Sequence, residues 1–441
     1  MNKVELQIML KKTEDKLDEL NRERLRIKQD LYYLDLYQNG YAKQSIDLYI
    51  EEDKQTLIEA IKFKSDFNAL KAHFFGYPGN LTDDSPLVRQ LRYEEAELFY
   101  INNAGDPFEN SYGAMDGKIY ERKVLELFFK RFDLDPTTSW GYVTSGGSES
   151  NVWAIQNGFK IFPNGHLYFC EAAHYSVAKA IGCHQKPLYP FTMIPKKNYL
   201  TEAIDIDILI KEIKNNYDKK KINPILLLTW GTTKYGSIDD VKKITDILHE
   251  LNIDYYLHVD AAFYGGIPIN QLDAPICPSL KELSANSLSV SFHKFFGVPN
   301  INSIVLSDSK TNGQKISYLG QHDTTVSGSR SFAIFSAYQR LKEVLERSPS
   351  DYYRKNIQVF LSLLKRYPIK YYRDGLSNII IIPKPNLTIL NKYQLATFEG
   401  KNNEITLAHF ILNPFHTAQE ITEFIQDIYD DQIHNNLVLD L

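Results

Sequence analysis

The most constraining feature of the chain is a series of short apolar segments that alternate with amphipathic segments from about residue 120 onward. The apolar segments are "HLYFC" (166–170), "PILLLTW" (224–230), "DYYLHVD" (254–260), "SLSVSF" (287–292) and "INSIVLS" (301–307). Strands that are apolar on both sides and separated by helices form a parallel sheet covered on both faces. The pattern predicts an α/β fold with a mostly parallel sheet, in which ligands bind at the carboxyl ends of the strands.

The pattern changes near residue 345, which predicts a second, smaller domain. Before this point, "DDVKKITDILHELN" (239–252) places apolar residues on one face of a helix between two strands. After it, "ERSPSDYYRK" precedes a helix, and "SNIIIIPK", "YQLATFEG" and "EITLAHFIL" are typical of strands. We therefore predict a large domain over 116–345 and a smaller C-terminal α+β domain over 346–441.

Residues 1–40 are predicted to form an N-terminal helical extension. Positions 10, 13, 17, 20, 24, 27, 31 and 34 alternate by three and four and carry Leu, Thr, Leu, Leu, Arg, Ile, Leu and Leu. Such a pattern with charged flanks is typical of a short coiled-coil seam, and "QNG" at 38–40 ends the helix. The pattern is equally typical of a helix that lies on its own domain and of a helix that pairs with another chain or a partner protein.

Composition excludes several classes of function. The net charge of −5 lacks the basic excess of a nucleic-acid-binding protein. The N-terminus lacks the apolar core of a secretory signal, and no run of about 18 apolar residues occurs. Cys170, Cys183 and Cys277 are too scattered for a disulfide framework or a metal cage, and the 11 histidines show no metal-ligand spacing. We expect a cytoplasmic protein that binds no nucleic acid, membrane or metal.

Polar residues gather where the predicted strands of the large domain end. In "GYVTSGGSESN" (141–151), Gly146, Gly147 and Ser148 precede a helix, whose unpaired N–H groups favour phosphate. Each such group taken singly is more often a turn, a cap or a packed ring. The other groups at strand ends are His174, Thr232, Thr233, Asp260 with Ala261 and Ala262, and Ser291, His293 and Lys294.

Taken together, these groups fit one cofactor, pyridoxal 5'-phosphate. It requires a lysine for a Schiff base, an acid opposite its ring nitrogen and a phosphate cradle. It also benefits from a flat group over the ring and a small residue beneath it. Aromatic and apolar neighbours disfavour the charged form of a lysine, which frees its amine as a nucleophile. The sequence predicts this site from Lys294, Asp260, the loop 146–148, His174 and Ala262.

The chain resembles the group II pyridoxal-phosphate-dependent amino-acid decarboxylases of fold type I, in particular the bacterial histidine decarboxylases and plant serine decarboxylases. The matching runs span about 75 to 335, and "YQLATFEGKNNEITLAHFILNP" extends them through the C-terminal lobe. The matching runs between 75 and 335 are "NNAGDPFENSYG", "WGYVTSGGSESN", "IFPNGHLYFCEAAHYSVAKA", "GTTKYGSIDD", "HVDAA", "SFHKFFGVP" and "HDTTVSGSR".

The resemblance implies a role for each matching residue. Lys294 would carry the cofactor, Asp260 would pair with the ring nitrogen, and His174 would stack on the ring and touch the substrate, with Ala262 below. Thr233 would contact the ring substituents. The residues expected around the phosphate are Gly146, Gly147, Ser148, Ser291, His293 and, from the neighbouring subunit, Ser329. The resemblance thus implies a homodimer with shared sites, to which residues 41–115 contribute.

The implied reaction is loss of the α-carboxylate of an L-amino acid as CO2, followed by protonation to give an amine. Histidine is the favoured substrate, because the histidine decarboxylases have a His-Asp pair where this chain has His322 and Asp323. Tyr318 or His322 is the candidate proton donor. The alternatives are decarboxylation of serine or another amino acid, a carbon–carbon lyase or decarboxylating aldehyde synthase on the same scaffold, and a non-catalytic member that binds through its N-terminal helix.

Three departures from the family pattern leave the substrate open. "GVPNINS" (297–303) lacks the second Pro, the Cys and the Gly that are common after the lysine. Phe292 stands where a Gly is usual, and Ser331–Ala333 replace the Asn-Gly-His that tends to follow "GSR". These positions are expected to lie close to the cofactor and the dimer contact.

Overall fold

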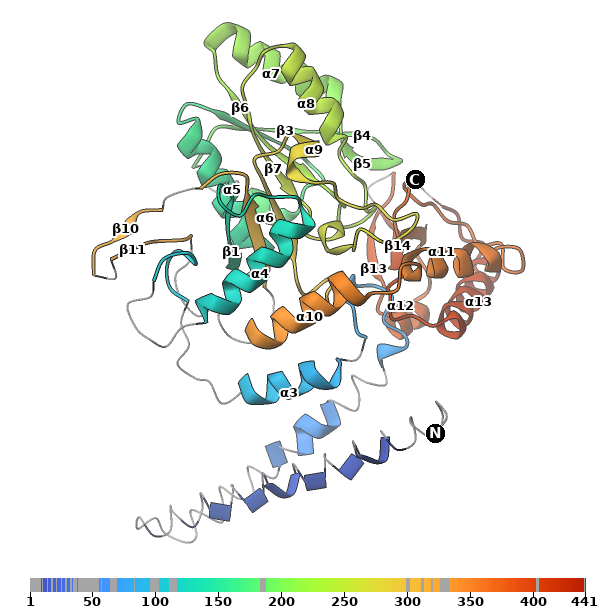
Figure 1. Cartoon of the computed structure of the whole chain (residues 1–441). Helices are drawn as coiled ribbons and strands as arrows, with labels where there is room; N and C mark the ends of the chain where they lie inside the picture. Colours follow the sequence, from blue (N-terminus) through green and yellow to red (C-terminus); the bar gives the residue numbers. More distant parts are fainter. Residues whose placement is uncertain are drawn as a thin grey trace. The chain divides into compact units, whose positions relative to one another are not determined.

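The computed structural model of the chain (Figure 1) forms two compact units, Met1–Ala72 and His73–Leu441. The residues that it describes are 70–82, 84–95, 103–110, 117–182, 188–298, 302–310, 313–318, 320–325, 334–401, 404–439 and 441, with scattered positions between 9 and 63. In the first unit, the described residues between Met9 and Gln38 are helical. Four apolar residues of the predicted seam, Leu20, Ile27, Leu31 and Leu34, are more than half exposed.

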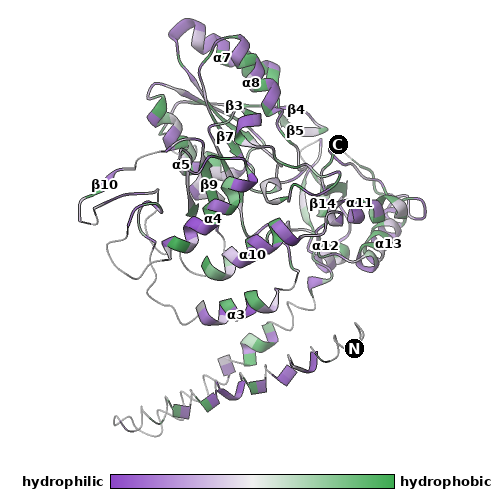
Figure 2. Cartoon of the chain, in the orientation of Figure 1, coloured by the Kyte–Doolittle hydropathy of each residue, from purple (hydrophilic) through white to green (hydrophobic). Residues whose placement is uncertain are grey.

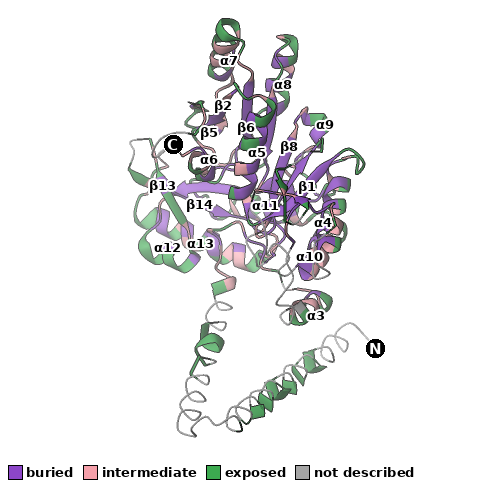
Figure 3. Cartoon of the chain, turned by 90° about the vertical axis from the view of Figure 1, so that its left-hand side faces the viewer, coloured by how far each residue is buried: buried purple, intermediate pink, exposed green. Residues whose placement is uncertain are grey.

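The second unit is built around a seven-stranded sheet whose central strands are buried on both faces. Its order is β1 (Trp140–Thr144), β9 (Ser303–Ser307), β8 (Ser287–Ser291), β7 (Tyr256–Asp260), β6 (Pro224–Thr229), β2 (His166–Cys170) and β3 (Phe191–Ile194). Only β9 runs antiparallel to its neighbours in this sheet. Every residue of β1, β6, β7, β8 and β9 is buried (Figure 3). The mostly parallel sheet and all five predicted strands are confirmed.

Helices whose buried faces are apolar connect the strands. In α8, the predicted apolar residues Val241, Ile244 and Leu248 are buried, and the Asp240 side chain accepts a hydrogen bond from the Lys243 amide at the helix start. Figure 2 shows hydrophilic and hydrophobic residues alternating along α7, α8 and α10. In the described parts of the chain, no helix has the length and apolar character needed to cross a membrane. The helices of the second unit that precede its C-terminal α+β part are α3 (Pro86–Glu95), α4 (Lys118–Arg131), α5 (Gly147–Ile161), α6 (Tyr175–Ala180), α7 (Ile206–Lys220), α8 (Val241–Glu250), the 3-10 turn η1 (Tyr264–Gly266), α9 (Leu280–Leu283) and α10 (Ile334–Arg347).

A second, antiparallel sheet forms the smaller C-terminal α+β part, as predicted. Its order is β12 (Ile379–Pro383), β14 (Ile405–Ile411) and β13 (Ala396–Glu399), and its helices are α11 (Tyr352–Leu363), α12 (Leu387–Tyr393) and α13 (Ala418–His434). Phe75 anchors an earlier segment in its core by stacking on Phe424 with ring centroids 4.2 Å apart. Two short hairpins complete the unit: β4 (Lys196–Asn198) with β5 (Thr201–Ile204), and β10 (Lys315–Ile316) with β11 (Gln321–His322).

The close approach of α5 to the sheet depends on Gly158. A Cβ atom at this position would lie 2.6 Å from Ile225 Cγ2 and 2.9 Å from Tyr256 Cδ1. We expect Gly158→Ala to lower the thermal unfolding midpoint, because overpacking costs about 1–3 kcal/mol and the helix propensity of Ala returns at most about 1 kcal/mol. Gln156→Ala, on the exposed face of α5, is the matched control and should leave the midpoint nearly unchanged. A Gly158→Ala protein that is more stable than the wild type would contradict this packing.

Candidate active site

The first turn of α5 lies at the carboxyl end of β1 and has free backbone amides. Gly146, at φ 153°, precedes the helix, and the Glu149 side chain accepts hydrogen bonds of 2.7 Å from the Ser145 amide and hydroxyl. Within the described residues, no group accepts from the amides of Gly147 and Ser148. A Cβ atom on Gly147 would lie 3.3 Å from Ser291 Oγ, so the glycine lets the helix start approach the end of β8. Two free amides, the exposed hydroxyl of Ser148 and the helix dipole favour a phosphate here.

Lys294 and Asp260 belong to one electrostatic cluster at the ends of the neighbouring strands β8 and β7. Asp260 is the last residue of β7 and is buried, and Lys294 follows β8 by three residues. Burial lowers the pKa of the Lys294 amine, and the negative charge of Asp260 acts in the opposite direction. The carboxylate of Asp260 accepts hydrogen bonds from Asn151 Nδ2 at 3.0 Å and from the Ala262 amide at 3.1 Å. The amine is thus biased toward its neutral, nucleophilic form while the carboxylate is held in place.

His174 joins this cluster from the start of α6. It is the residue before the helix, and its Nδ1 lies 2.8 Å from Ser176 Oγ and accepts from the Ser176 amide at 3.3 Å. Burial lowers the pKa of His174, while the charge of Asp260 raises it and that of Lys294 lowers it. The flat ring of His174 is thus coupled to both groups and is shifted toward its neutral form.

Of the other predicted cofactor contacts, Ser291 and His293 lie beside this cluster, whereas no contact with it is described for Thr233 or Ser329. Ser291 is buried with its Oγ 2.9 Å from Ser303 Oγ, and its amide donates to the Ala262 carbonyl at 3.2 Å. Burial and the Lys294 charge lower the pKa of His293 to about 4, and its Nδ1 is buried without a partner among the described residues. Thr233 is exposed in the loop after β6, and no described contact joins it to Lys294 or Asp260. Ser329 lies outside the described residues.

These groups fit pyridoxal phosphate. The free amides at the start of α5 suit its phosphate, and a buried amine biased toward its neutral form suits a covalent bond to its aldehyde carbon. Asp260 is a buried carboxylate whose two hydrogen-bond donors leave room for a third, which suits a protonated ring nitrogen. The unpartnered Nδ1 of His293 is a further polar atom that a ligand could satisfy.

The candidate proton donors lie on the β10–β11 hairpin, and within the described residues neither makes a hydrogen bond or ion pair with Lys294, Asp260 or His174. Tyr318, in the turn of the hairpin, is 78% exposed. His322 pairs instead with Glu109: its Nδ1 lies 2.6 Å from Glu109 Oε1, and its amide donates to Oε2 at 2.7 Å. In Figure 1 the hairpin extends from the side of the unit where α4 lies.

Several residues of the site had no role in the sequence prediction. Asn151 contacts Asp260, and its position one helical turn after Gly147 is a spacing that could have revealed it. The buried amine of Lys118 donates to the Asp106 carbonyl and to Gln321 Oε1, both at 2.8 Å, and so supports the Glu109–His322 pair. The segments of this pair lie about 200 positions apart, so no local pattern could have linked them.

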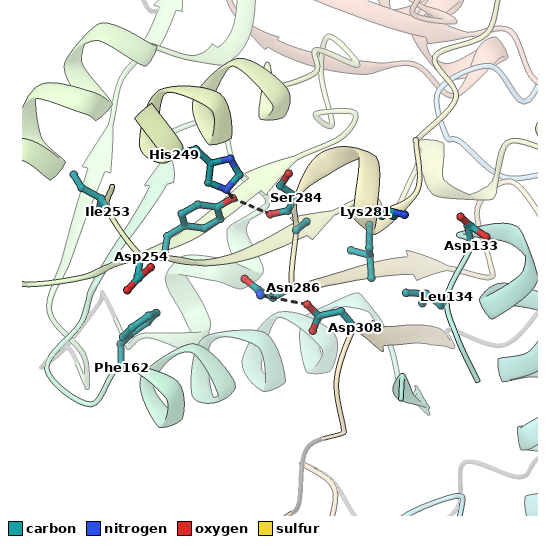
Figure 4. Close-up of a pocket in the computed structure, with 13 residues that line it drawn as sticks. Asp133, Leu134, Phe162, His249, Ile253, Asp254, Lys281, Ser284, Asn286 and Asp308 are labelled. Carbon is teal, nitrogen blue, oxygen red and sulfur yellow. Dashed lines mark hydrogen bonds between the residues drawn. The ribbon is translucent and has the colours of Figure 1, made fainter. Parts of the chain in front are cut away.

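A cavity of about 690 Å³ lies at the amino ends of the parallel strands β7 and β8, away from this cluster (Figure 4). The residues that line it include Asp254 before β7, Asn286 before β8 and Phe162 after α5. The Tyr255 hydroxyl there lies 3.0 Å from His249 Nε2 and donates to the Ser284 carbonyl at 3.0 Å. No cluster of three His, Cys, Asp or Glu side chains able to hold a metal occurs among the described residues. Ligands of parallel sheets bind at the carboxyl ends, which favours the Lys294 cluster.

Sequence comparison supports the same chemistry. Residues 160–358 match the family described as "Pyridoxal-dependent decarboxylase conserved domain". A histidine decarboxylase of Acinetobacter baumannii is 31% identical over 381 residues, which cover 82% of this chain and 92% of the relative. Serine decarboxylase 2 of Oryza sativa subsp. japonica is 29% identical over 404 residues, which cover 86% and 82%.

Solved structures share the fold at lower sequence identity. The L-methionine decarboxylase of Streptomyces sp. 590 superposes with a TM-score of 0.69 at 16% identity, covering 85% of this chain and 94% of that protein. A sphingosine-1-phosphate lyase of Burkholderia pseudomallei superposes with a TM-score of 0.63 at 14% identity, covering 87% and 92%. The predicted fold type I architecture is confirmed.

Proposed function

Since this chain belongs to the pyridoxal-dependent decarboxylase family, we propose that it converts L-histidine to histamine and CO2. The family membership makes the chain a pyridoxal-phosphate-dependent amino-acid decarboxylase, which is a carboxy-lyase. The choice of histidine is carried by one observation: His322 is oriented by two hydrogen bonds to Glu109, in the His-Asp motif that resembles the histidine decarboxylases. The family relationship to a histidine decarboxylase over 92% of its length supports it.

We assign the binding of the cofactor to the cluster around Lys294. The residues that would hold it are Lys294 through its amine, Asp260 through its carboxylate, the first turn of α5 around the phosphate, and His174 over the ring. Gly146, Gly147, Ser148, Ser291 and His293 belong to the phosphate end, Ala262 and Thr233 to the ring, and Ser329 of a second subunit completes the set. When bound, pyridoxal phosphate supplies the electron sink for the electrons that the departing carboxylate leaves behind.

The protein would position the substrate and donate one proton to its α-carbon. With substrate bound, His174 and the buried strand ends would shield the α-carbon from water, which would strengthen every charge interaction there. Glu109 accepts from Nδ1–H of His322, so the doubly protonated imidazolium is the form that can act as the acid, and the proton that it would deliver is the one on Nε2. Delivery of this proton to the α-carbon after CO2 departs gives the amine. Tyr318, exposed in the same hairpin, is the alternative donor.

A screen of the purified protein with the twenty amino acids and cofactor tests the substrate directly. Mass spectrometry of the products should show histamine and CO2 without ammonia or aldehyde. Serine is the second candidate, because serine decarboxylase 2 of rice is 29% identical to the chain. Ethanolamine in place of histamine would overturn the histidine proposal, and ammonia or an aldehyde would indicate another reaction on this scaffold.

We also propose that the active protein is a homodimer with shared sites, in which His322 serves the neighbouring subunit. In this proposal the chain consists of an N-terminal helix (1–40), a segment that contributes to the dimer (41–115), a large cofactor-binding domain (116–345) and a small C-terminal domain (346–441). The exposed seam residues of the N-terminal helix favour pairing with another chain or a partner protein.

Mixing two inactive variants tests the shared site. His322→Phe should lower kcat by about 10²–10⁴-fold, the usual contribution of a general acid. Co-expression of His322→Phe with Lys294→Ala should then restore about a quarter of the wild-type activity, because half of randomly mixed dimers are heterodimers with one intact site of two. Activity that stays at the level of the separate variants would place His322 and Lys294 in the same subunit, and unchanged turnover of His322→Phe would remove His322 from the mechanism.

A further inference from the structure

A row of polar side chains lies buried behind Asp260, beneath α5. Alternate residues of a strand share one face of the sheet, so Tyr256, His258 and Asp260 of β7 point the same way. On β8, Ser287 pairs in register with His258, and Ser289 pairs with Asp260. None of these five residues is more than 6% exposed. We call them the β7–β8 polar row.

The hydrogen bonds of the row define where the proton of His258 lies. Asn157 Nδ2 of α5 donates to the Tyr256 hydroxyl at 3.4 Å, which leaves the single proton of Tyr256 for Ser287 Oγ at 2.7 Å. Ser287 then has its own proton to donate to Nδ1 of His258 at 2.8 Å. Burial lowers the pKa of His258 to about 4 against the charge of Asp260, so the ring is neutral near pH 7. A neutral imidazole that accepts at Nδ1 carries its proton at Nε2.

Three buried polar atoms around Asp260 have no partner among the described residues. They are His258 Nε2, Ser289 Oγ and Asn151 Oδ1. Asn151 already donates to Asp260 through its amide nitrogen, Ser289 pairs with Asp260 in register, and His258 is electrostatically coupled to it. A buried polar atom without a hydrogen bond costs about 1–3 kcal/mol, so three together around one carboxylate call for a common partner.

We propose that His258 is a positioning residue for Asp260: its Nε2–H donates to the carboxylate through one buried water shared with Ser289 and Asn151. The donation fixes the direction of the carboxylate, so the row connects α5 to the group that would face the ring nitrogen. The other titratable groups that face Asp260 are His174 of α6 and Lys294 after β8. The inference rests on the cofactor of the family and is independent of the proposed histidine substrate.

Two nearly isosteric substitutions separate this role from packing. The side-chain nitrogen of His258→Gln lies close to the position of Nε2, whereas that of His258→Asn lies close to the position of Nδ1. We expect pyridoxal phosphate to dissociate from full-length holoenzyme with about a tenfold higher Kd in His258→Asn and His258→Phe, and within about threefold of wild type in His258→Gln.

Tyr168→Phe is the matched control for a lost buried hydroxyl in the same sheet. Tyr168 on β2 accepts from Asn216 Nδ2 at 2.7 Å and lies two strands from β7. Its loss should lower the unfolding midpoint without changing the Kd for the cofactor. If the Gln and Asn variants lose cofactor equally, or if His258→Phe retains it as wild type does, the proposal is wrong.

Discussion

Lys294→Ala is expected to abolish decarboxylation. The amine is the only group of the cluster able to bond covalently to an aldehyde, and its surroundings bias it toward the neutral, reactive form. We expect kcat to fall by at least about 10³-fold, equal to about 4 kcal/mol of lost transition-state stabilisation. The visible absorbance of the lysine-bound cofactor should disappear as well. Borohydride treatment followed by peptide mass spectrometry should find the cofactor on residue 294 in the wild type and no labelling there in Lys294→Ala.

Lys211→Ala is the control for a lost lysine, because Lys211 is exposed on α7. It should retain wild-type activity, absorbance and borohydride labelling at residue 294. Substantial turnover in Lys294→Ala, or labelling of another lysine in the wild type, would show that the cluster is not the cofactor site.

Asp260→Asn should be the second most damaging substitution. It keeps the shape of the side chain but removes the negative charge that would hold the ring nitrogen protonated. We expect kcat to fall by about 10²–10³-fold, the range for loss of one electrostatic stabiliser in a buried site, with a smaller change in KM. Asp246→Asn, at a half-exposed position of α8 that pairs with Lys242, is the charge-matched control and should leave kcat unchanged.

Asp260→Asn should also change the pH dependence of cofactor binding. The charge of Asp260 raises the pKa of Lys294, so its removal lowers this pKa further. Since only the neutral amine attacks the cofactor, the acid limb of the rate at which stripped protein recaptures pyridoxal phosphate should move to lower pH in Asp260→Asn. A limb that stays in place, together with wild-type turnover, would mean that residues 260 and 294 act in separate places.

Much of the site could be predicted because its parts are local. The apolar strands, the glycines before α5, and the polar residues that follow each strand are patterns of a few residues, and the topology of a parallel sheet brings strand ends together. His174, Asp260, Ser291 and Lys294 lie where this logic places them. Asn151 was missed although its helical spacing from Gly147 was visible, because an asparagine inside a helix is usually a surface residue.

Other parts could not be predicted, because they depend on contacts between distant segments. The Glu109–His322 pair joins a loop before α4 to a hairpin after β9, and only the packing around the buried amine of Lys118 brings them together. The β7–β8 polar row depends on register: "YLHVD" and "SLSVS" each look like ordinary buried strands, and a shift of one residue would turn every side chain to the other face.

The sequence by itself determined the class of fold, the cofactor and the residues at the strand ends, because local hydrophobic periodicity and motif spacing carry that information. The tertiary structure alone decided which polar side chains meet beneath α5 and which proton each can donate. Hydrogen bonds act over about 3 Å, a distance that strand register and helix packing set and that no spacing along the chain records.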